Sequence, residues 1–145
     1  MGAFDLREIE FQSDGLRDSL TMAMAPELFY ENLKREIAAT KRLAQELVIV
    51  SLVLHTAEFA SNAAFQEALI GIAHGLRTGL RGEDFFTRIS DVGFWVLLRA
   101  DQRDASAIIE RWNLPNQDQI TSAVVPRADL EYQEWIPRVD QIHFK

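Results

Sequence analysis

Residues 81–98 constrain the fold of this 145-residue chain more than any other stretch. Two runs rich in aromatic and β-branched residues, 84–89 and 94–99, lie on either side of a short polar segment. Such runs are typical of β-strands, and small polar residues with glycine are typical of tight turns. The stretch therefore predicts a β-hairpin. Its turn residues are Ser90, Asp91 and Gly93.

The remaining segments alternate between extended and helical patterns. Residues 47–54 form a continuous apolar, β-branched run, which predicts a central strand buried on both faces. A shorter run at 120–125 stops at Pro126 and predicts another strand. Apolar residues recur at helical spacing in three segments, 26–45, 62–80 and 101–112. The order predicts an α/β (α+β) fold with a central, mainly antiparallel sheet flanked by helices.

Three glycines lie on one side of the second predicted helix. Gly71, Gly75 and Gly79 are spaced by four residues. Because glycine allows a backbone to approach closely, we expect this side of the helix to pack directly on the sheet.

Composition limits the partners and the compartment. The net charge of −7 argues against a nucleic-acid or anionic membrane partner. The chain has no cysteine, which excludes disulfides and thiolate metal sites and is compatible with the reducing cytoplasm. No apolar run reaches membrane-spanning length and no signal pattern opens the chain, so we expect a cytoplasmic protein without membrane insertion.

Several segments resemble, in order, the sequence pattern of the GGDEF domain of diguanylate cyclases. That family has Arg-x-x-Asp, five further residues, and then the signature Gly-Gly-Asp/Glu-Glu-Phe. Here Arg81 and Asp84 match, and five residues separate them from the signature position. Residues 18–29 resemble the family's D-x-L-T-G-L-x-N-R-x-x-F, with Met22 in place of its glycine. Asp140 and Phe144 match the family's last segment.

The resemblance implies a palm-like nucleotidyl-cyclase fold and two parts of the chain. Residues 1–17 would be an N-terminal lead segment, and residues 18–145 would be a degenerate GGDEF-like domain. The family's catalytic residues are replaced. Of its signature only the phenylalanine remains, in the series Ser90, Asp91, Val92, Gly93 and Phe94.

The positions at which the family holds its metal ions have also changed. The family's D-x-D-x-F-K corresponds to a segment in which His55 and Ala57 replace the two aspartates. Its other metal carboxylates fall on Val92 and Gly93. The resemblance therefore implies that this chain is not an enzyme and needs no metal or other cofactor.

A replacement metal site is a separate hypothesis. His55, Glu58 and Asp91 could together supply one nitrogen and two carboxylate ligands. The alternative is that His55 and Glu58 are ordinary loop residues at the end of a strand. An enzyme of a new kind, or a related palm-type cyclase, would need two convergent carboxylates near His55.

The Arg-x-x-Asp pair is the candidate binding site, because in the family it forms the inhibitory site for cyclic di-GMP. A guanidinium can grip a phosphate or stack on guanine, and a carboxylate can accept hydrogen bonds from guanine. The alternative is that Arg81 and Asp84 only frame the hairpin through a local ion pair or strand cap. A second cation could come from a nearby arginine, with Arg111 nearest to the family's position. The candidates are Arg88, Arg103 and Arg111.

The sequence therefore predicts a catalytically inactive regulatory module of bacterial signalling, with cyclic di-GMP as ligand or GTP in the remnant cleft. The alternative is a protein-interaction or homodimerisation module with no nucleotide ligand. An exposed apolar patch near Val92, Phe94 and Trp95 would favour that alternative. The tryptophans are expected in the core, although Trp95 could instead cover the vacated nucleotide cleft. They are Trp95, Trp112 and Trp135.

Overall fold

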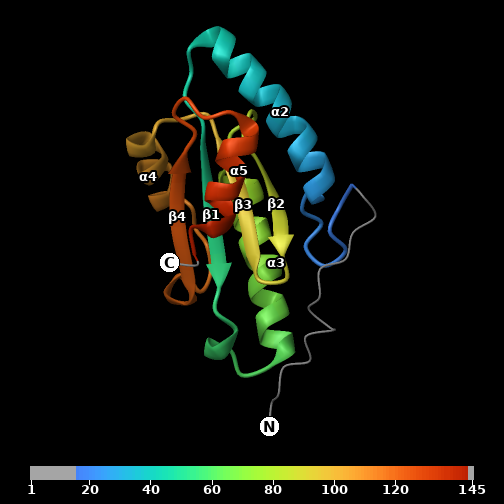
Figure 1. Ribbon diagram of the computed structural model, residues 1–145. Helices are drawn as coiled ribbons and strands as arrows, with labels where there is room; N and C mark the ends of the chain where they lie inside the picture. Colours follow the sequence, from blue (N-terminus) through green and yellow to red (C-terminus); the bar gives the residue numbers. More distant parts are fainter. Residues whose placement is uncertain (1–15, 144–145) are drawn as a thin grey trace.

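A four-stranded sheet forms the centre of the computed structural model, which describes residues 16–143 (Figure 1). Each strand is antiparallel to its neighbours, in the order β2-β3-β1-β4. The strands are β1 (Val48–Leu54), β2 (Phe85–Ser90), β3 (Gly93–Leu98) and β4 (Ile120–Pro126). The strands predicted at 47–54, 84–89, 94–99 and 120–125 are therefore confirmed to within one residue at each end.

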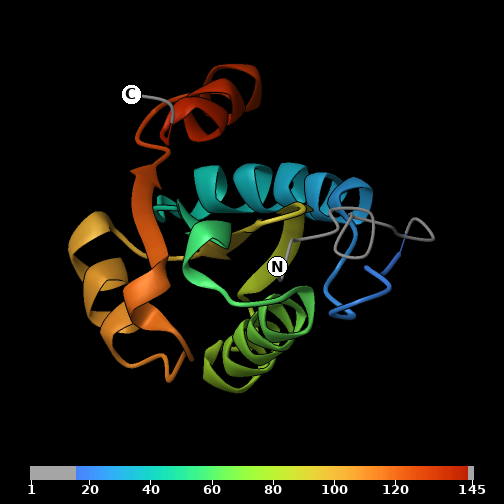
Figure 2. The ribbon, with the colours of Figure 1, turned by 90° about the horizontal axis from the view of Figure 1, so that it is seen from below.

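Helices cover both faces of the sheet (Figure 2). One face carries α2 (Pro26–Leu43) and α5 (Tyr132–Gln141), and the other carries α3 (Asn62–Gly79) and α4 (Gln102–Glu110). Strand β1 is buried on both sides because Val50 packs into one core and Ile49 into the other. Each buried aliphatic side chain of this kind contributes about 1.5–3 kcal/mol. The predicted α+β architecture is confirmed.

Local sequence signals set the helix boundaries. Pro26 occupies the first turn of α2, where its missing N–H is not needed. Ser61 and Asp101 cap α3 and α4 by accepting a hydrogen bond from the backbone three residues on. Helix α4 ends at Glu110, two residues before the predicted end. Helix α5, which the sequence analysis did not predict, begins with a capping box between Glu131 and Glu134.

The three glycines of α3 do not pack on the sheet, so that expectation was wrong. They face the connection between α4 and β4 instead. A Cβ added at Gly71 would lie 2.8 Å from Pro115, and one at Gly75 would lie 2.8 Å from Leu114. The apolar side of α3 already fills the sheet face, and the glycine side admits this connecting segment. All three tryptophans are buried, as predicted.

A short turn precedes α2 and is fixed to the hairpin by a buried ion pair. Both Asp18 and Arg88 have fully buried side chains, and Nη1 of Arg88 lies 3.1 Å from Oδ1 of Asp18. Nη2 of Arg88 also donates to the carbonyl of Asp91 at 2.8 Å. Arg88 is therefore a structural residue, and the expectation that it could supply a second cation to a ligand was wrong.

Two sequence-based predictions concern residues that the structure does not describe. Most of the predicted lead segment, and Phe144, lie outside the described residues, so the boundary at residue 17 stays a prediction.

None of the helices in residues 16–143 has both the length and the apolar character needed to span a bilayer.

Replacing Arg88 by methionine should lower the free energy of unfolding by about 3–5 kcal/mol, because Asp18 would remain as an unpaired buried charge. Urea denaturation measures this loss. The matched control is Lys41→Met, which breaks the exposed ion pair with Glu131 and should leave the free energy of unfolding nearly unchanged. Equal losses of unfolding free energy in the two variants would show that the buried pair contributes no more to stability than the exposed pair.

Candidate functional site

Arg81 and Asp84 meet in the turn between α3 and β2. Oδ2 of Asp84 accepts hydrogen bonds from the backbone N–H of Arg81 at 3.2 Å and from its Nε at 2.9 Å. Oδ1 accepts from Nη2 of Arg81 at 3.3 Å. The Asp84 side chain is fully buried, whereas that of Arg81 is 45% exposed. The carboxylate thus holds an exposed guanidinium in one orientation.

The ion pair between Arg81 and Asp84 is the local contact predicted by the alternative in which these residues only frame the hairpin. One nitrogen of the guanidinium can still donate to a ligand. Nη2 of Arg81 donates additionally to the carbonyl of Arg99 at 3.0 Å, whereas Nη1 makes no hydrogen bond to residues 16–143. The hydrogen bond to Asp84 is the main reason that the pKa of Arg81 is raised, so the guanidinium is always charged.

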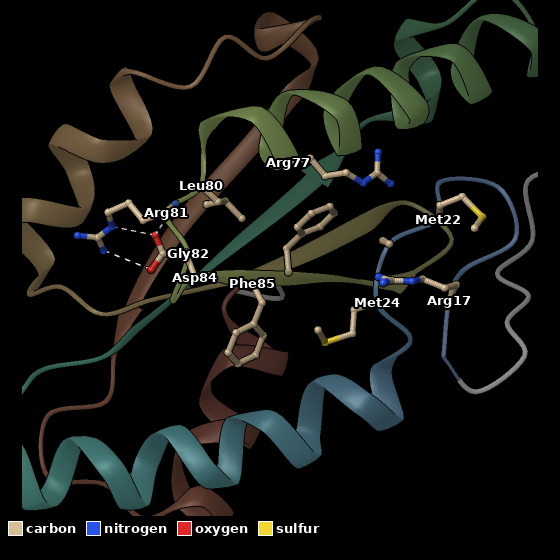
Figure 3. A pocket seen from close by; sticks show the side chains of 11 residues that line it. Arg17, Met22, Met24, Arg77, Leu80, Arg81, Gly82, Asp84 and Phe85 are labelled. Atoms are coloured by element: carbon tan, nitrogen blue, oxygen red, sulfur yellow. Dashed lines mark hydrogen bonds and ion pairs between the residues drawn. The ribbon is translucent and has the colours of Figure 1, made fainter.

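A hollow of about 560 Å³ opens beside this turn, between the end of α3, strand β2 and the segment before α2 (Figure 3). We call it the arginine hollow. Arg81 and Asp84 lie at one end of it, and Arg17 and Met22 lie at the other. It is lined by Arg17, Met22, Ala23, Met24, Arg77, Leu80, Arg81, Gly82, Asp84, Phe85 and Phe86.

Two further arginines share this hollow with Arg81, and the sequence reasoning missed both. The guanidinium of Arg77 lies 5.9 Å from the ring centre of Phe86 and donates to the carbonyl of Thr21. Arg17 is exposed. Arg77 lies in the last turn of α3, whereas Arg81 follows the end of that helix, so helical spacing does not connect the two residues. Arg111, the favoured second cation, lines neither this hollow nor the other hollow that contains Arg81.

A different hollow, of about 380 Å³, lies at the hairpin turn on the α2–α5 face. We call it the turn hollow. Among its lining residues within 16–143 there is no lysine or arginine, and a 2.8 Å hydrogen bond joins Nε2 of His143 to Oγ of Ser51. It is lined by Ser51, Val53, Ile89, Ser90, Val92, Gly93, Trp95, Val139, Asp140 and His143.

The hairpin turn does not carry the exposed apolar patch that the interaction alternative asked for. Phe94 and Trp95 are 1% and 3% exposed, and Val92 is half-buried. Trp95 is buried in the core beneath α2, as predicted, and it also lines the turn hollow. That it covers a vacated nucleotide cleft stays a prediction.

Comparison with solved structures shows which known proteins have a similar fold. A microbial GGDEF domain, described for a novel interaction mode with bis-(3′,5′)-cyclic di-GMP, matches with a TM-score of 0.73, 17% identity and coverage of 87% of this chain and 88% of that chain. The GGDEF domain of DgcB from Caulobacter crescentus, in complex with c-di-GMP, matches with a TM-score of 0.72, 13% identity and coverage of 89% and 88%. Diguanylate cyclase SiaD from Pseudomonas aeruginosa, in complex with its activator SiaC, matches with a TM-score of 0.70 and 22% identity over 86% of this chain and 55% of that chain.

This chain has the GGDEF-domain fold. The sequence itself matches no protein-family model and no curated protein, so the likeness rests on the arrangement of helices and strands. The resemblance proposed from the order of short motifs is confirmed at the level of the fold.

The residues that the sequence resemblance aligned with the family's metal positions make other contacts. His55 follows β1, is exposed, and hydrogen-bonds through Nε2 to the hydroxyl of Thr121 on β4. Val92 lies in the hairpin turn and Gly93 begins β3, and the carbonyl of Val92 accepts from the N–H of Leu54 at 2.9 Å. Among the described side chains of residues 16–143, no three His, Asp or Glu groups are arranged to hold a metal ion.

Burial shifts the pKa values of two ionisable groups near the turn hollow, Asp140 and Tyr30. It raises the pKa of Asp140. Burial, and then the negative charge of Asp140, raise the pKa of Tyr30 to about 12. Because the folded-state pKa of Tyr30 lies above its ordinary value of 10.0, the stability contributed by its neutral phenol is complete below pH 10. It is lost as the pH rises through about 12.

We expect Asp140→Asn to lower the pKa of Tyr30, because the amide removes a negative charge that disfavours the phenolate. The ultraviolet absorbance of tyrosinate measures the shift, in a Tyr132→Phe background that leaves a single tyrosine to titrate. Asp129→Asn is the control, because Asp129 is exposed and does not contribute to the shift. An unchanged titration in Asp140→Asn would mean that the two groups do not interact.

Proposed function

We propose that this chain is a catalytically inactive GGDEF-like regulatory module that binds cyclic di-GMP at Arg81 and Asp84. The observation that carries the proposal is the exposed guanidinium of Arg81, which a buried carboxylate holds in one orientation. The two residues lie at one end of the arginine hollow, and the guanidinium points away from the hollow's other lining residues (Figure 3). A ligand phosphate can bind Nη1 without breaking the pair with Asp84. The predicted bacterial and cytoplasmic setting belongs to the same proposal.

Charge favours binding of the rest of the ligand on the side of the arginine hollow, while the guanidinium of Arg81 points toward the other hollow that it lines, near the carbonyl of Arg99. The other hollow beside Arg81 is lined by four carboxylates, which would repel a phosphate. They are Glu46, Glu83, Asp101 and Asp104. On the side of the arginine hollow, the ligand would meet Arg77 and an apolar floor that includes Phe86, on which a guanine ring can stack. Arg77 is thus a candidate for the second cation beside Arg111.

The proposed loss of cyclase activity is supported by residue identity. Phosphodiester synthesis from nucleoside triphosphates needs carboxylates that hold divalent metal and cations that meet the triphosphate. The metal positions of the family correspond to His55, Ala57, Val92 and Gly93, none of which is a carboxylate. The turn hollow, which lies against Val92 and Gly93, contributes no cationic Lys or Arg side chain.

Calorimetric titration of cyclic di-GMP into the wild type and Arg81→Ala tests the proposal. Charge-assisted hydrogen bonds are worth about 1.5–3 kcal/mol, so the variant should bind roughly tenfold to a hundredfold more weakly. Two further variants compare the candidates for the second cation, Arg77→Ala and Arg111→Ala. The position whose loss weakens binding is the one that contacts the ligand.

No heat and no rise in melting temperature for the wild type at high ligand concentration would sink the receptor proposal. If Arg81→Ala binds cyclic di-GMP as tightly as the wild type, the ligand binds at another site. In either case, the module is better explained by the alternative function, recognition of a protein partner or a second copy without any nucleotide.

A further inference from the structure

Strand β4 lies at one edge of the sheet, and its outer side has no neighbouring strand. The strand order β2-β3-β1-β4 gives β4 a single neighbour, β1, among residues 16–143 (Figure 1). The opposite edge is protected. There the segment before α2 covers β2, because Met24 forms a parallel bridge with Thr87 and its carbonyl accepts a hydrogen bond from the Thr87 hydroxyl at 2.6 Å. The open edge of the described sheet is therefore that of β4.

The hydrogen bonds between β1 and β4 determine which backbone groups of β4 point outward. The N–H of Arg127 donates to the carbonyl of Leu47 at 2.9 Å, and the N–H of His55 donates to the carbonyl of Gln119 at 3.0 Å. Both bonds continue one antiparallel register, in which bonded and non-bonded pairs alternate. The odd-numbered residues of β4 therefore bond to β1. The residues whose N–H and carbonyl groups point outward are Ile120, Ser122 and Val124.

These outward backbone groups have no hydrogen-bond partner within residues 16–143. Ser122 is exposed, and a hollow of about 230 Å³ lies beside it between α4 and the start of β4. Helix α4 thus leaves this part of the strand accessible. A row of unpaired N–H and carbonyl groups along a strand is matched by another extended chain. The geometry of this edge therefore selects a β-strand as its partner.

A second copy of β4 fits this edge in antiparallel register. The outward residues are symmetric about Ser122, so a two-fold axis at Ser122 places Ile120 of one copy opposite Val124 of the other. Each outward N–H then meets an outward carbonyl. The side chains of Ile120 and Val124 are half-buried in one copy, and the pairing brings them into contact across the two strands. Pro126, which has no N–H to donate, falls outside these pairs.

The charges near the edge allow two copies to meet. Residues 120–126 include no charged side chain, although lysine and other charges commonly protect open edges. In the symmetric register, Asp118 lies opposite Pro126 of the other copy and not opposite a second carboxylate. The two chains still repel each other at a distance, because each carries a net charge of −7. Added salt should therefore strengthen the association.

We propose that the open edge of β4 is a docking surface for a second copy of this chain, so that two four-stranded sheets join into one continuous antiparallel sheet. Backbone hydrogen bonds along a single strand bury little surface, so the dimer forms at high protein concentration. This edge is opposite to β2 and separate from the nucleotide contacts proposed for Arg81 and Asp84. Either proposal can therefore fail without the other.

Sedimentation velocity and residue-resolved amide hydrogen exchange, on the full chain without nucleotide, test the proposal together. The dimer fraction should rise with protein concentration and with salt, and exchange of the outward amides should slow with it. The outward amides are those of Ile120, Ser122 and Val124. The amides of Thr121 and Ala123 bond to β1 and should be protected at every concentration. A chain that stays monomeric, or outward amides that are protected even in the dilute monomer, would overturn the proposal.

Ser122→Pro is the decisive variant, because it removes the outward N–H at the two-fold axis without removing a bond to β1. We expect the dimer Kd to rise about tenfold or more while the melting temperature of the monomer changes little. Ser122→Lys places like charges against each other at the axis and should have the same effect without altering the backbone. The matched control is Thr78→Lys, which adds the same charge at an exposed position of α3. Undiminished dimerisation in the Ser122 variants, or an equal loss in Thr78→Lys, would rule out the β4 edge.

Discussion

The buried ion pair between Asp18 and Arg88 joins the segment before α2 to the β2–β3 hairpin. Two charges removed from water are tolerated only when they satisfy each other and their remaining hydrogen bonds are made. Here Thr21 and the carbonyl of Asp91 supply several of those bonds. The pair fixes the turn that carries Met22, and that turn forms one end of the arginine hollow. This buried ion pair therefore shapes that end of the hollow.

The sheet separates two regions that the GGDEF-type fold brings near the same hairpin. The arginine hollow lies at the β2 edge beside α3, where Arg17 and Arg77 line an apolar floor and the guanidinium of Arg81 points away from it (Figure 3). The turn hollow lies on the opposite face, beneath α5, and its lining within residues 16–143 includes no Lys or Arg side chain. A binding function is supported at the first region by charge and exposure. At the turn hollow, Trp95 and Val92 line the cavity, and the carbonyl of Val92 in the hairpin turn accepts a hydrogen bond from the backbone N–H of Leu54.

The candidate site could be predicted in part. Arg81 and Asp84 were found because their separation along the chain is also their separation in space, within one short turn. Arg88 was misassigned because its burial depends on Asp18, which is distant in sequence. Arg17 was missed for the same kind of reason, since it reaches the hollow only through the fold of the segment before α2. The glycines of α3 show the same limit. Their spacing predicted that another part of the chain packs closely against α3, but not that this part is the connection between α4 and β4.

The sequence by itself determined the strands, three of the helices and the order of short motifs that resembles GGDEF domains, because local periodicity and turn chemistry are sufficient for these features. The same resemblance implied, as a prediction, that carboxylates are missing at the family's metal positions. Only the tertiary structure decided which arginines share a hollow, that Arg88 is buried, and that Met22 stands exposed in a left-handed turn. Burial and contact between residues distant in sequence arise from packing, which no local pattern specifies.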